Sequence, residues 1–547
     1  MWPLRHGANI GRREARAQGR TGRTPGIFGG MRRFLLAAIL SAAAAAPLAA
    51  QAPESNLYLP ISSWATPYVE HLIRAGVLQG LDPLTRPLKR ADVARAVAKV
   101  DTTGLAESVK SSLRLLSWEL EERPDAVRWK VEAAVAAQGA SDASRWTVRP
   151  ERENSGLFWQ GALTGSLEFP HVGIVTSPYF DTRLKRDTQY VGRQDRVIAG
   201  DNAEAYVLAS WKYVELFFGS EPRNWGTPEV DGLMLSPNPY PYDHLMLRLG
   251  PRRLRLEMIA TQLNDAALPS QGRPARRFMS LHRLVVLPSD RLAFAVSEGV
   301  LYADTAGGPS GSFEPWYLNP ANLWLLPDYG RHGPTTKAFV AADVSYLAGN
   351  DLRLAGQLFV NDLRVDKGSA ASPEKPEELG YTLAASGGAL HGLASWTAFY
   401  TRVDNLVYQT QKGPQFDYVL YGAGIGRDHI DYDQLTARAN ALVAPRTLVG
   451  GAITLIRQGE GALLRPFPPD SLRGDSLRFL TGIVERTLRL AVQANWTPAP
   501  GINLSTDVGR HFIWNANHVQ GVRGDRWVWR IQAEIRRRVG GGIHWPD

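Results

Sequence analysis

The chain has 547 residues, of which 44% are hydrophobic and 21% charged, so pervasive disorder is excluded. It contains no cysteine, which excludes disulfides, cysteine-ligated metals, thiol catalysis and a lipobox anchor. The formal net charge of +9 arises mainly in residues 1–50, which hold eight Arg and one Glu. Because the rest of the chain carries a balance of only +2, the charge gives no support for a nucleic-acid partner.

The stretch "MRRFLLAAILSAAAAAPLAA" predicts a secretory signal peptide over residues 31–50. It has two arginines, an apolar run and a small-residue cleavage site before Gln51. Residues 1–30 are interpreted as upstream sequence from a mis-assigned start codon, with an Arg-rich transit peptide or basic tail as the alternative. No apolar run of membrane-spanning length follows Gln51. An exported chain of this kind is either free in the periplasm or medium, or a β-barrel in an outer membrane.

Residues 51–126 are predicted to form a small helical periplasmic unit. Tyr68, Leu72 and Val77 recur at helical spacing, "PLKRADVARAVAKV" starts a second helix, and "AESVKSSLRLLSWELEERP" forms a third.

Part of this unit, about residues 56–100, resembles an S-layer homology (SLH) module. The resemblance rests on Trp64, the series Tyr68, Leu72, Gly76 and Gly80, and "RPLKRADVARAVA". It implies binding to peptidoglycan or another wall polymer. The alternative is a helical cap that packs for structural reasons.

From Trp129 onward the apolar period changes from helical to two. In "VERTLRLAVQANW", Leu488, Leu490 and Val492 share one face, and Arg489 and Gln493 the other. Alternating segments of about ten residues separated by Gly- and Pro-rich breaks are typical of a transmembrane β-barrel. At about 20–25 residues per strand and turn, residues 127–547 predict a mostly β protein, a large antiparallel barrel of about 16–20 strands with 18 favoured.

The last predicted strand, "WVWRIQAEIRRRVGGGIHW", alternates almost without error, with Arg537 as an intruder on the apolar face. Its end, with Gly540, Ile543 and Trp545, resembles the terminal β-signal read by the barrel-assembly machinery, although Pro546 and Asp547 follow it. The expected partners are therefore outer-membrane lipid and that machinery.

Four segments in order resemble the Wzi-like outer-membrane capsule assembly proteins over about residues 129–547. They are "LFFGSEPRNWGTPEVDGLMLSPNPYPYDHLML", "RRFMSLHRLVVLPSDRLAFAVSEGVLYA", "WYLNPANL" and "YGAGIGRDHIDYDQL". The resemblance implies a barrel of around 18 strands with a helical periplasmic portion. It also implies a lectin-like role in holding capsular polysaccharide at the cell surface.

A glycan site needs flat aromatic faces and planar hydrogen-bonding groups. The predicted glycan-binding or lumen residues are Arg223, Asn224, Trp225, Asn238, Asp243, His282, Arg283, Glu298, Trp316 and Asn319. Further aromatic residues in loop-like stretches are Tyr240, Tyr242, Tyr317, Trp324 and Tyr329. The alternative is that the aromatics belong to an interface girdle or to loop packing, and that the charged residues form a structural network in the lumen.

No metal or cofactor is predicted. Asp428, Asp431 and Asp433 in "DHIDYD" lack the spacing and glycine of a calcium loop. The sequence has no HExxH, Walker A or G-x-S-x-G motif, and "GAGIGR" is interpreted as a tight turn rather than a dinucleotide loop.

These observations predict an exported, non-catalytic outer-membrane barrel that binds surface polysaccharide and takes part in capsule assembly or attachment. The alternative is a porin-like channel tethered to the cell wall by the SLH-like unit. A lipid-modifying barrel enzyme is third.

Overall fold

The computed structural model describes residues 55–121, 127–150, 154–196, 198–267, 274–303, 313–324, 336–349, 351–362, 378–468 and 479–543. These residues belong to one compact unit, Gln51–Asp547. Several predictions lie outside the described residues, namely the upstream segment 1–30, the signal peptide 31–50, Tyr329, Trp545, Pro546 and Asp547.

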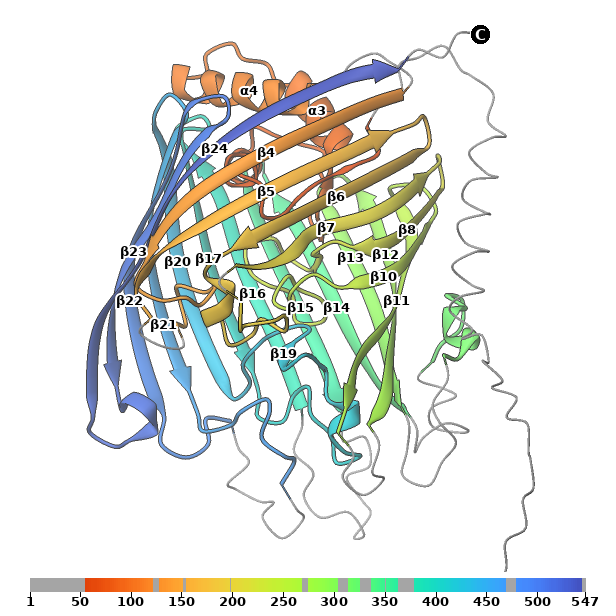
Figure 1. Ribbon diagram of the computed structural model, residues 1–547, viewed down its shortest axis with the longest axis vertical. Helices are drawn as coiled ribbons and strands as arrows, with labels where there is room; N and C mark the ends of the chain where they lie inside the picture. The colour runs from red at the N-terminus through yellow and green to blue at the C-terminus, as the bar shows by residue number, and fades with distance from the viewer. Residues whose placement is uncertain are drawn as a thin grey trace, which may run out of the picture. The chain divides into compact units, whose positions relative to one another are not determined.

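Eighteen antiparallel strands close into a single barrel, which confirms the predicted fold class and strand number (Figure 1). The barrel closes where the last strand pairs with the first barrel strand. In chain order the barrel strands are β4 (Val127–Ala140), β5 (Gly156–Glu168), β6 (Val172–Asp181), β7 (Ala199–Ser210), β8 (Val214–Ser220), β10 (Asp243–Leu249), β11 (Leu254–Ala266), β12 (Ala275–Ser289), β13 (Leu292–Ala303), β14 (Thr336–Ala348), β15 (Leu352–Asp362), β16 (Glu378–Ala389), β17 (Ala394–Val403), β20 (Tyr432–Ala444), β21 (Thr447–Gln458), β22 (Glu485–Ala499), β23 (Ile502–Trp514) and β24 (Arg523–Ile543).

The alternation in β24 separates an outward apolar face from an inward polar face, as the sequence predicts. Ile531 and Ile535 are 53% and 65% exposed on the outside, while Gln532 and Glu534 point inward. Arg537 is exposed on the outward face, and the pairing with β4 continues through it without a register shift. Because of this period of two, successive residues of β24 face the lipid and the lumen in turn.

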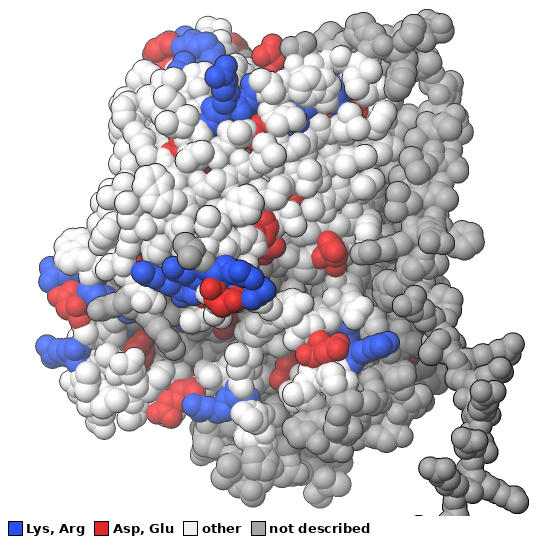
Figure 2. All heavy atoms as spheres, in the orientation of Figure 1, with Lys and Arg blue, Asp and Glu red and all other residues white. Residues whose placement is uncertain are grey.

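Exposed aromatic side chains form two girdles on the outer wall. One lies near the ends joined by turns of two to four residues, and the other near the opposite ends of the strands. The first contains Trp129, Tyr213, Phe294, Tyr346, Trp396 and Trp496, and the second Trp159, Phe180, Trp514 and Trp527. Figure 2 shows a broad uncharged band on this wall between groups of charged residues.

An apolar band between aromatic girdles is the surface that a bilayer requires, so the protein is a membrane-spanning barrel of the outer-membrane type. Short turns face the periplasm and long loops the outside in such barrels, and here the long connections have eight residues or more. Among the described residues, no helix combines the length and apolar character needed to span a bilayer.

Three helices pack at the short-turn end of the barrel (Figure 1). They are α2 (Thr66–Arg74), α3 (Arg90–Ala98) and α4 (Glu107–Leu120). Their buried side chains pack with Leu442 and Leu448 of the barrel. Gly388 of the barrel has no room for a side chain, because a Cβ there would lie 2.7–2.9 Å from the Ala75 backbone.

Residues that carry the SLH resemblance serve this docking. Trp64, Tyr68 and Leu72 are all buried, and the Tyr68 hydroxyl donates a hydrogen bond of 2.7 Å to the Arg446 carbonyl. His71 bonds to the Ser395 hydroxyl at 2.9 Å, and burial lowers the pKa of this imidazole to about 4. The helices are therefore held by buried contacts to the barrel rather than presenting these residues to solvent.

Two segments that are far apart in the sequence meet inside the lumen and form a plug. The first is the stretch between α2 and α3, which contains the short strands β2 (Thr85–Arg86) and β3 (Leu88–Lys89). β3 pairs with β1 (Tyr58–Leu59), which precedes α2. The second is the β8–β10 connection, whose strand β9 (Asn224–Trp225) pairs with β2. Residues 404–431, with β18 (Val419–Leu420) and β19 (Ala423–Gly424), add Tyr408 and Tyr418 to the same core.

The two faces of β5 allow a direct test of the membrane assignment. Leu163 lies midway between the girdle residue Trp159 and the short-turn end and is 53% exposed, whereas its neighbour Thr164 faces the lumen. Leu163→Lys is expected to lower the free energy of unfolding by ~2–4 kcal/mol, because it places a charge in hydrocarbon. Thr164→Lys is the matched control and is expected to cost less than ~1 kcal/mol. The measurement is guanidinium unfolding from lipid vesicles followed by tryptophan fluorescence, and equal losses in the two variants would contradict the assignment.

Candidate functional site

Asn224 and Trp225 lie in the plug and stabilise it. Trp225 is 1% exposed, and its carbonyl accepts a hydrogen bond of 2.9 Å from the Gln357 amide. The Asn224 side chain accepts from the Gly232 N–H at 2.6 Å and donates to the Val230 carbonyl at 3.3 Å. Because Trp225 is buried against the plug and the wall, and the Asn224 amide is bonded within the plug, neither side chain presents a face to a ligand.

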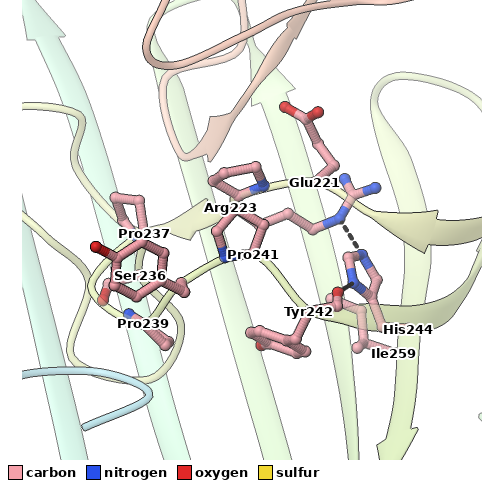
Figure 3. Close-up of a pocket in the computed structure, with 11 residues that line it drawn as sticks. Glu221, Arg223, Ser236, Pro237, Pro239, Pro241, Tyr242, His244 and Ile259 are labelled. Atoms are coloured by element: carbon pink, nitrogen blue, oxygen red, sulfur yellow. Dashed lines mark hydrogen bonds between the residues drawn. The ribbon is translucent and has the colours of Figure 1, made fainter. Parts of the chain in front are cut away.

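Arg223 also bonds within the protein, as Figure 3 shows. Its Nε–H donates to His244 Nε2 at 2.7 Å, and its guanidinium stacks 4.4 Å from the centroid of Phe217. The pocket drawn there has a volume of about 10 Å³, room for about one water molecule and not for a sugar. Asn238 donates to the Gly424 carbonyl at 2.8 Å and is likewise part of the plug.

Arg283 faces the lumen, and its contacts are those of a structural network of charged residues rather than of a ligand site. It donates to the Leu84 carbonyl at 3.1 Å and forms an ion pair of 2.9 Å with Asp343. Its guanidinium lies 5.2 Å from the centroid of Trp225. Arg283 therefore links the barrel wall to the plug.

The prediction that His282 and Glu298 face the lumen is wrong. Because Arg283 points inward, its neighbour His282 points outward, and the cross-strand partner Glu298 lies on the same outer face. The two side chains bond at 2.8 Å, and Trp324 covers them, with its ring 4.1 Å from the imidazole and its backbone N–H donating to Glu298 at 2.9 Å. Residues 313–324, the outer strap, thus pack against the outside of the wall, which a period of two cannot reveal.

Three other predicted residues also lie outside the lumen. Trp316 and Asn319 belong to the outer strap, in or next to the 3₁₀ turn η3 (Pro315–Leu318), and Asn319 is exposed. Asp243 is exposed on the outward face of β10, since its neighbour His244 is buried and directed to Arg223. None of the three reaches the lumen.

The aspartates of "DHIDYD" have separate partners. Asp431 accepts from the backbone N–H groups of Gly461 and Leu480, at 3.0 and 2.7 Å. Asp433 pairs with Arg457, and Asp428 accepts from the Gln189 amide at 2.6 Å. Asp431 and Asp428 therefore organise loop contacts, whereas Asp433 joins the neighbouring strands β20 and β21.

A large cavity lies between the plug and one side of the barrel wall. Its volume is about 1160 Å³, and its wall consists of β24 and β4–β7. Lining residues extend from Arg128 and Gly540 near the short-turn end to Gln160 and Asp181 near the long-loop end. Eight basic and eight acidic side chains line it, so its walls are strongly polar but balanced in charge.

At the short-turn end these charges pair with one another. Glu119 of α4 forms ion pairs with Arg90 and Arg538, both at 3.3 Å, and lies 3.8 Å from Lys130. Burial raises the pKa of Glu119, but these cations outweigh it and hold the pKa below its ordinary value. This end of the cavity is therefore a fixed ionic network.

At the long-loop end the cavity is lined by an aromatic shelf, which consists of Arg145, Trp146 and Tyr240. The Arg145 guanidinium lies 4.0 Å from the centroid of Tyr240 and 5.5 Å from that of Trp146. Arg145 donates to the Asn238 carbonyl at 2.6 Å. The Tyr240 hydroxyl donates to Asp187 at 2.8 Å, and burial, together with Asp187, raises the pKa of Tyr240.

The polar groups around the shelf are a buried indole N–H, a guanidinium and two amides. The Trp146 indole N–H has no acceptor among the described residues. Arg530 of β24 holds the loop by donating to the Ser144 and Arg145 carbonyls, at 2.5 and 3.0 Å. Gln138 and Gln532 bond to each other at 2.8 Å across the same wall and add amide groups to the lining.

Sequence reasoning missed Arg145 and Trp146. Both lie in "SDASRWTVRP", an ordinary polar break between two strands. The adjacent guanidinium and indole were the available signal, but nothing in the sequence indicated that this loop folds inward. Of the predicted aromatics, Tyr240 lines the cavity.

The fold and the cavity define a class, an outer-membrane β-barrel with a plugged lumen and a polar internal cavity. Among solved structures, the chain is similar to Wzi, an outer-membrane protein involved in group 1 capsule assembly in Escherichia coli and described as a carbohydrate-binding β-barrel. The TM-score is 0.56 at 12% identity, over 88% of this chain and 99% of that chain, which shows a shared fold. Pseudomonas aeruginosa OccD3 aligns with a TM-score of 0.44 at 10% identity, over 75% and 91% of the two chains. Neither a protein-family model nor a curated protein matches this sequence.

The contacts of Asn224 predict that its loss weakens the plug. Asn224→Ala is expected to lower the free energy of unfolding by ~1–3 kcal/mol, because it leaves the buried Gly232 N–H without its acceptor. Asn319→Ala, at an exposed position of the outer strap, is the control and is expected to change stability by less than ~0.5 kcal/mol. The measurement is chemical unfolding in detergent, and an Asn224→Ala variant of native stability with reduced glycan affinity would contradict the structural role.

Proposed function

We propose that this protein binds a surface polysaccharide in its lumen cavity and takes part in capsule assembly or attachment without catalysis. The observation that carries the proposal is the cavity of about 1160 Å³ with the aromatic shelf at its long-loop end. The shared fold with Wzi, itself described as carbohydrate-binding, supports it.

The chemistry of the lining suits a sugar chain. Sugar rings place C–H groups on aromatic faces, as Trp146 and Tyr240 offer, and their hydroxyls need both donors and acceptors. Gln138, Gln160 and Gln532 supply both from one amide, and the balanced charges supply both from different residues. A polar ligand therefore finds partners along the whole wall.

The test is binding of the organism's own purified surface polysaccharide to the barrel in detergent. Trp146→Ala is expected to weaken binding about fivefold to tenfold, which corresponds to the loss of one aromatic contact. Trp159→Ala removes an aromatic that faces lipid, 55% exposed on the outer side of β5, and is expected to bind like the native protein. Unchanged affinity in Trp146→Ala, or equal losses in both variants, would contradict a site on the shelf.

A second candidate is the porin-like channel, tethered to peptidoglycan or another wall polymer by the helical unit. The observation that favours a channel is the length of the cavity, whose lining residues on β5 run from Gln160 to Glu168. If the helical unit tethers the channel, residues other than the buried Trp64 and Tyr68 would have to contact the cell-wall polymer.

The channel makes a distinct prediction in planar bilayers. If the cavity conducts, Thr164→Trp should reduce single-channel conductance severalfold, because the indole would enter the lumen. Leu163→Trp, on the lipid face of the same strand, should leave conductance unchanged. Absence of conductance in the native barrel would remove the channel as a function.

A further inference from the structure

The barrel wall has a gap on its long-loop side. β8 and β10 have seven residues each, between the longer strands β7 and β11. β7 pairs with β8 only from Ala205 onward, and β11 pairs with β10 only up to Ala260. The edges Ala199–Glu204 and Thr261–Ala266 therefore face each other, and no strand of the described part of the chain lies between them (Figure 1). Three strand spacings separate them, about 14 Å.

The register places this gap within the membrane. Gly200, on the open edge, pairs with Phe180 of the outer girdle, so the edge continues from there toward the bilayer interior. Backbone groups without partners are tolerated at that depth where protein or a water-filled cavity meets them. The Tyr190 hydroxyl donates to the Gly200 carbonyl at 2.7 Å and satisfies one such group.

The lumen cavity reaches the gap. Ala203 and Glu204 of the open edge line the cavity, as do Pro239 and Pro241 of the segment that faces them. Between Thr176 and Pro178 the β6–β7 register shifts, and this β-bulge lies where the pairing with β8 stops.

Two carboxyl groups form the edge of the gap that lies nearest the short-turn end of the barrel. Glu204 and Glu221 lie opposite each other just beyond the last β7–β8 pair, Ala205 with Ser220. Neither Glu221 oxygen has a donor among the described residues, and Glu221 is buried. Such polar groups are tolerated at this depth beside a hydrated cavity and not against lipid.

The outer side of the gap is amphipathic. Phe180 and Ile198 are 58% and 60% exposed beside it. Lys185 and Arg186, in the 3₁₀ turn η1 (Leu184–Arg186) of the β6–β7 connection, are exposed, and the Arg186 guanidinium lies 5.8 Å from the centroid of the Phe158 ring of β5. Figure 2 shows basic residues gathered over this part of the wall.

We propose that this gap is a lateral opening that admits the sugar part of an anionic glycolipid of the outer leaflet into the lumen cavity, while its acyl chains stay in the membrane. The inference rests on the proposed function, because it uses the same cavity. Apolar residues at the outer face fit acyl chains, the basic residues above them fit phosphate or carboxylate groups, and the polar cavity behind fits the sugars.

The test uses a photoreactive benzoylphenylalanine placed on the outer wall of the full barrel in vesicles of phospholipid and rough lipopolysaccharide. The test positions are Asn202 and Gln262, exposed on the two open edges. The control is Val492, 57% exposed on the unbroken wall of β22. Crosslinking to lipopolysaccharide is expected to be at least fivefold higher at the gap than at Val492, with similar crosslinking to phospholipid. Equal crosslinking to lipopolysaccharide at all three positions would overturn the proposal, and so would enrichment of phospholipid alone.

Two further arms separate this proposal from the proposed function. Lys185→Ala combined with Arg186→Ala should lower the lipopolysaccharide enrichment and leave binding of a lipid-free oligosaccharide unchanged. If the oligosaccharide binds and no enrichment is seen at the gap, the lateral opening is wrong and the glycan site stands. If neither the oligosaccharide nor lipopolysaccharide binds, both are wrong.

Discussion

Buried ion pairs between the inner wall and the inserted N-terminal segment hold the lumen in its observed form. Arg255 of β11 pairs with Asp82, and Glu215 of β8 pairs with Lys89. Arg283 of β12 pairs with Asp343 of the wall itself and donates to the Leu84 carbonyl of the inserted segment. A charge on the inside of a barrel is costly unless it is paired or hydrated. On the side of β8 and β10–β15 the plug supplies the partners, so wall and plug depend on each other.

On the opposite side of the lumen, neighbouring charges around the cavity take the place of plug residues as partners. β24 and β4–β7 present a polar face to the cavity, and the β8–β10 connection borders both the cavity and the plug. One segment thus has two functions: its first half, with Asn224 and Trp225, completes the plug, and its second half, with Tyr240, forms part of the aromatic shelf. This division explains how a barrel can be blocked on one side and still hold a ligand-sized space.

The alternation of residues was sufficient to predict the barrel, because lipid and lumen impose opposite polarity on successive positions, as Ile531 and Gln532 show. It was not sufficient for the site. The motif "RNWG" carried the family resemblance, yet it lies in the plug, while the shelf residues Arg145 and Trp146 lie in an unremarkable loop. The outer strap explains the error at His282 and Glu298: a strand residue on the outer face looks like a lumen residue when another part of the chain covers it. Loop paths depend on contacts between distant segments, which local periodicity does not encode.

The central claim is that the cavity beside β24 and β4–β7 is hydrated and takes up the glycan. Because the chain has no cysteine, a single introduced thiol reports on one position. Ser166→Cys places it in the cavity, and Ser345→Cys places it on the inward face of β14, where Ser345 is buried. With a hydrophilic thiosulfonate reagent, the account predicts rapid labelling of Ser166→Cys, protection of it by the purified polysaccharide, and little labelling of Ser345→Cys. A Ser166→Cys variant that does not react, or that reacts equally with and without polysaccharide, would contradict the account.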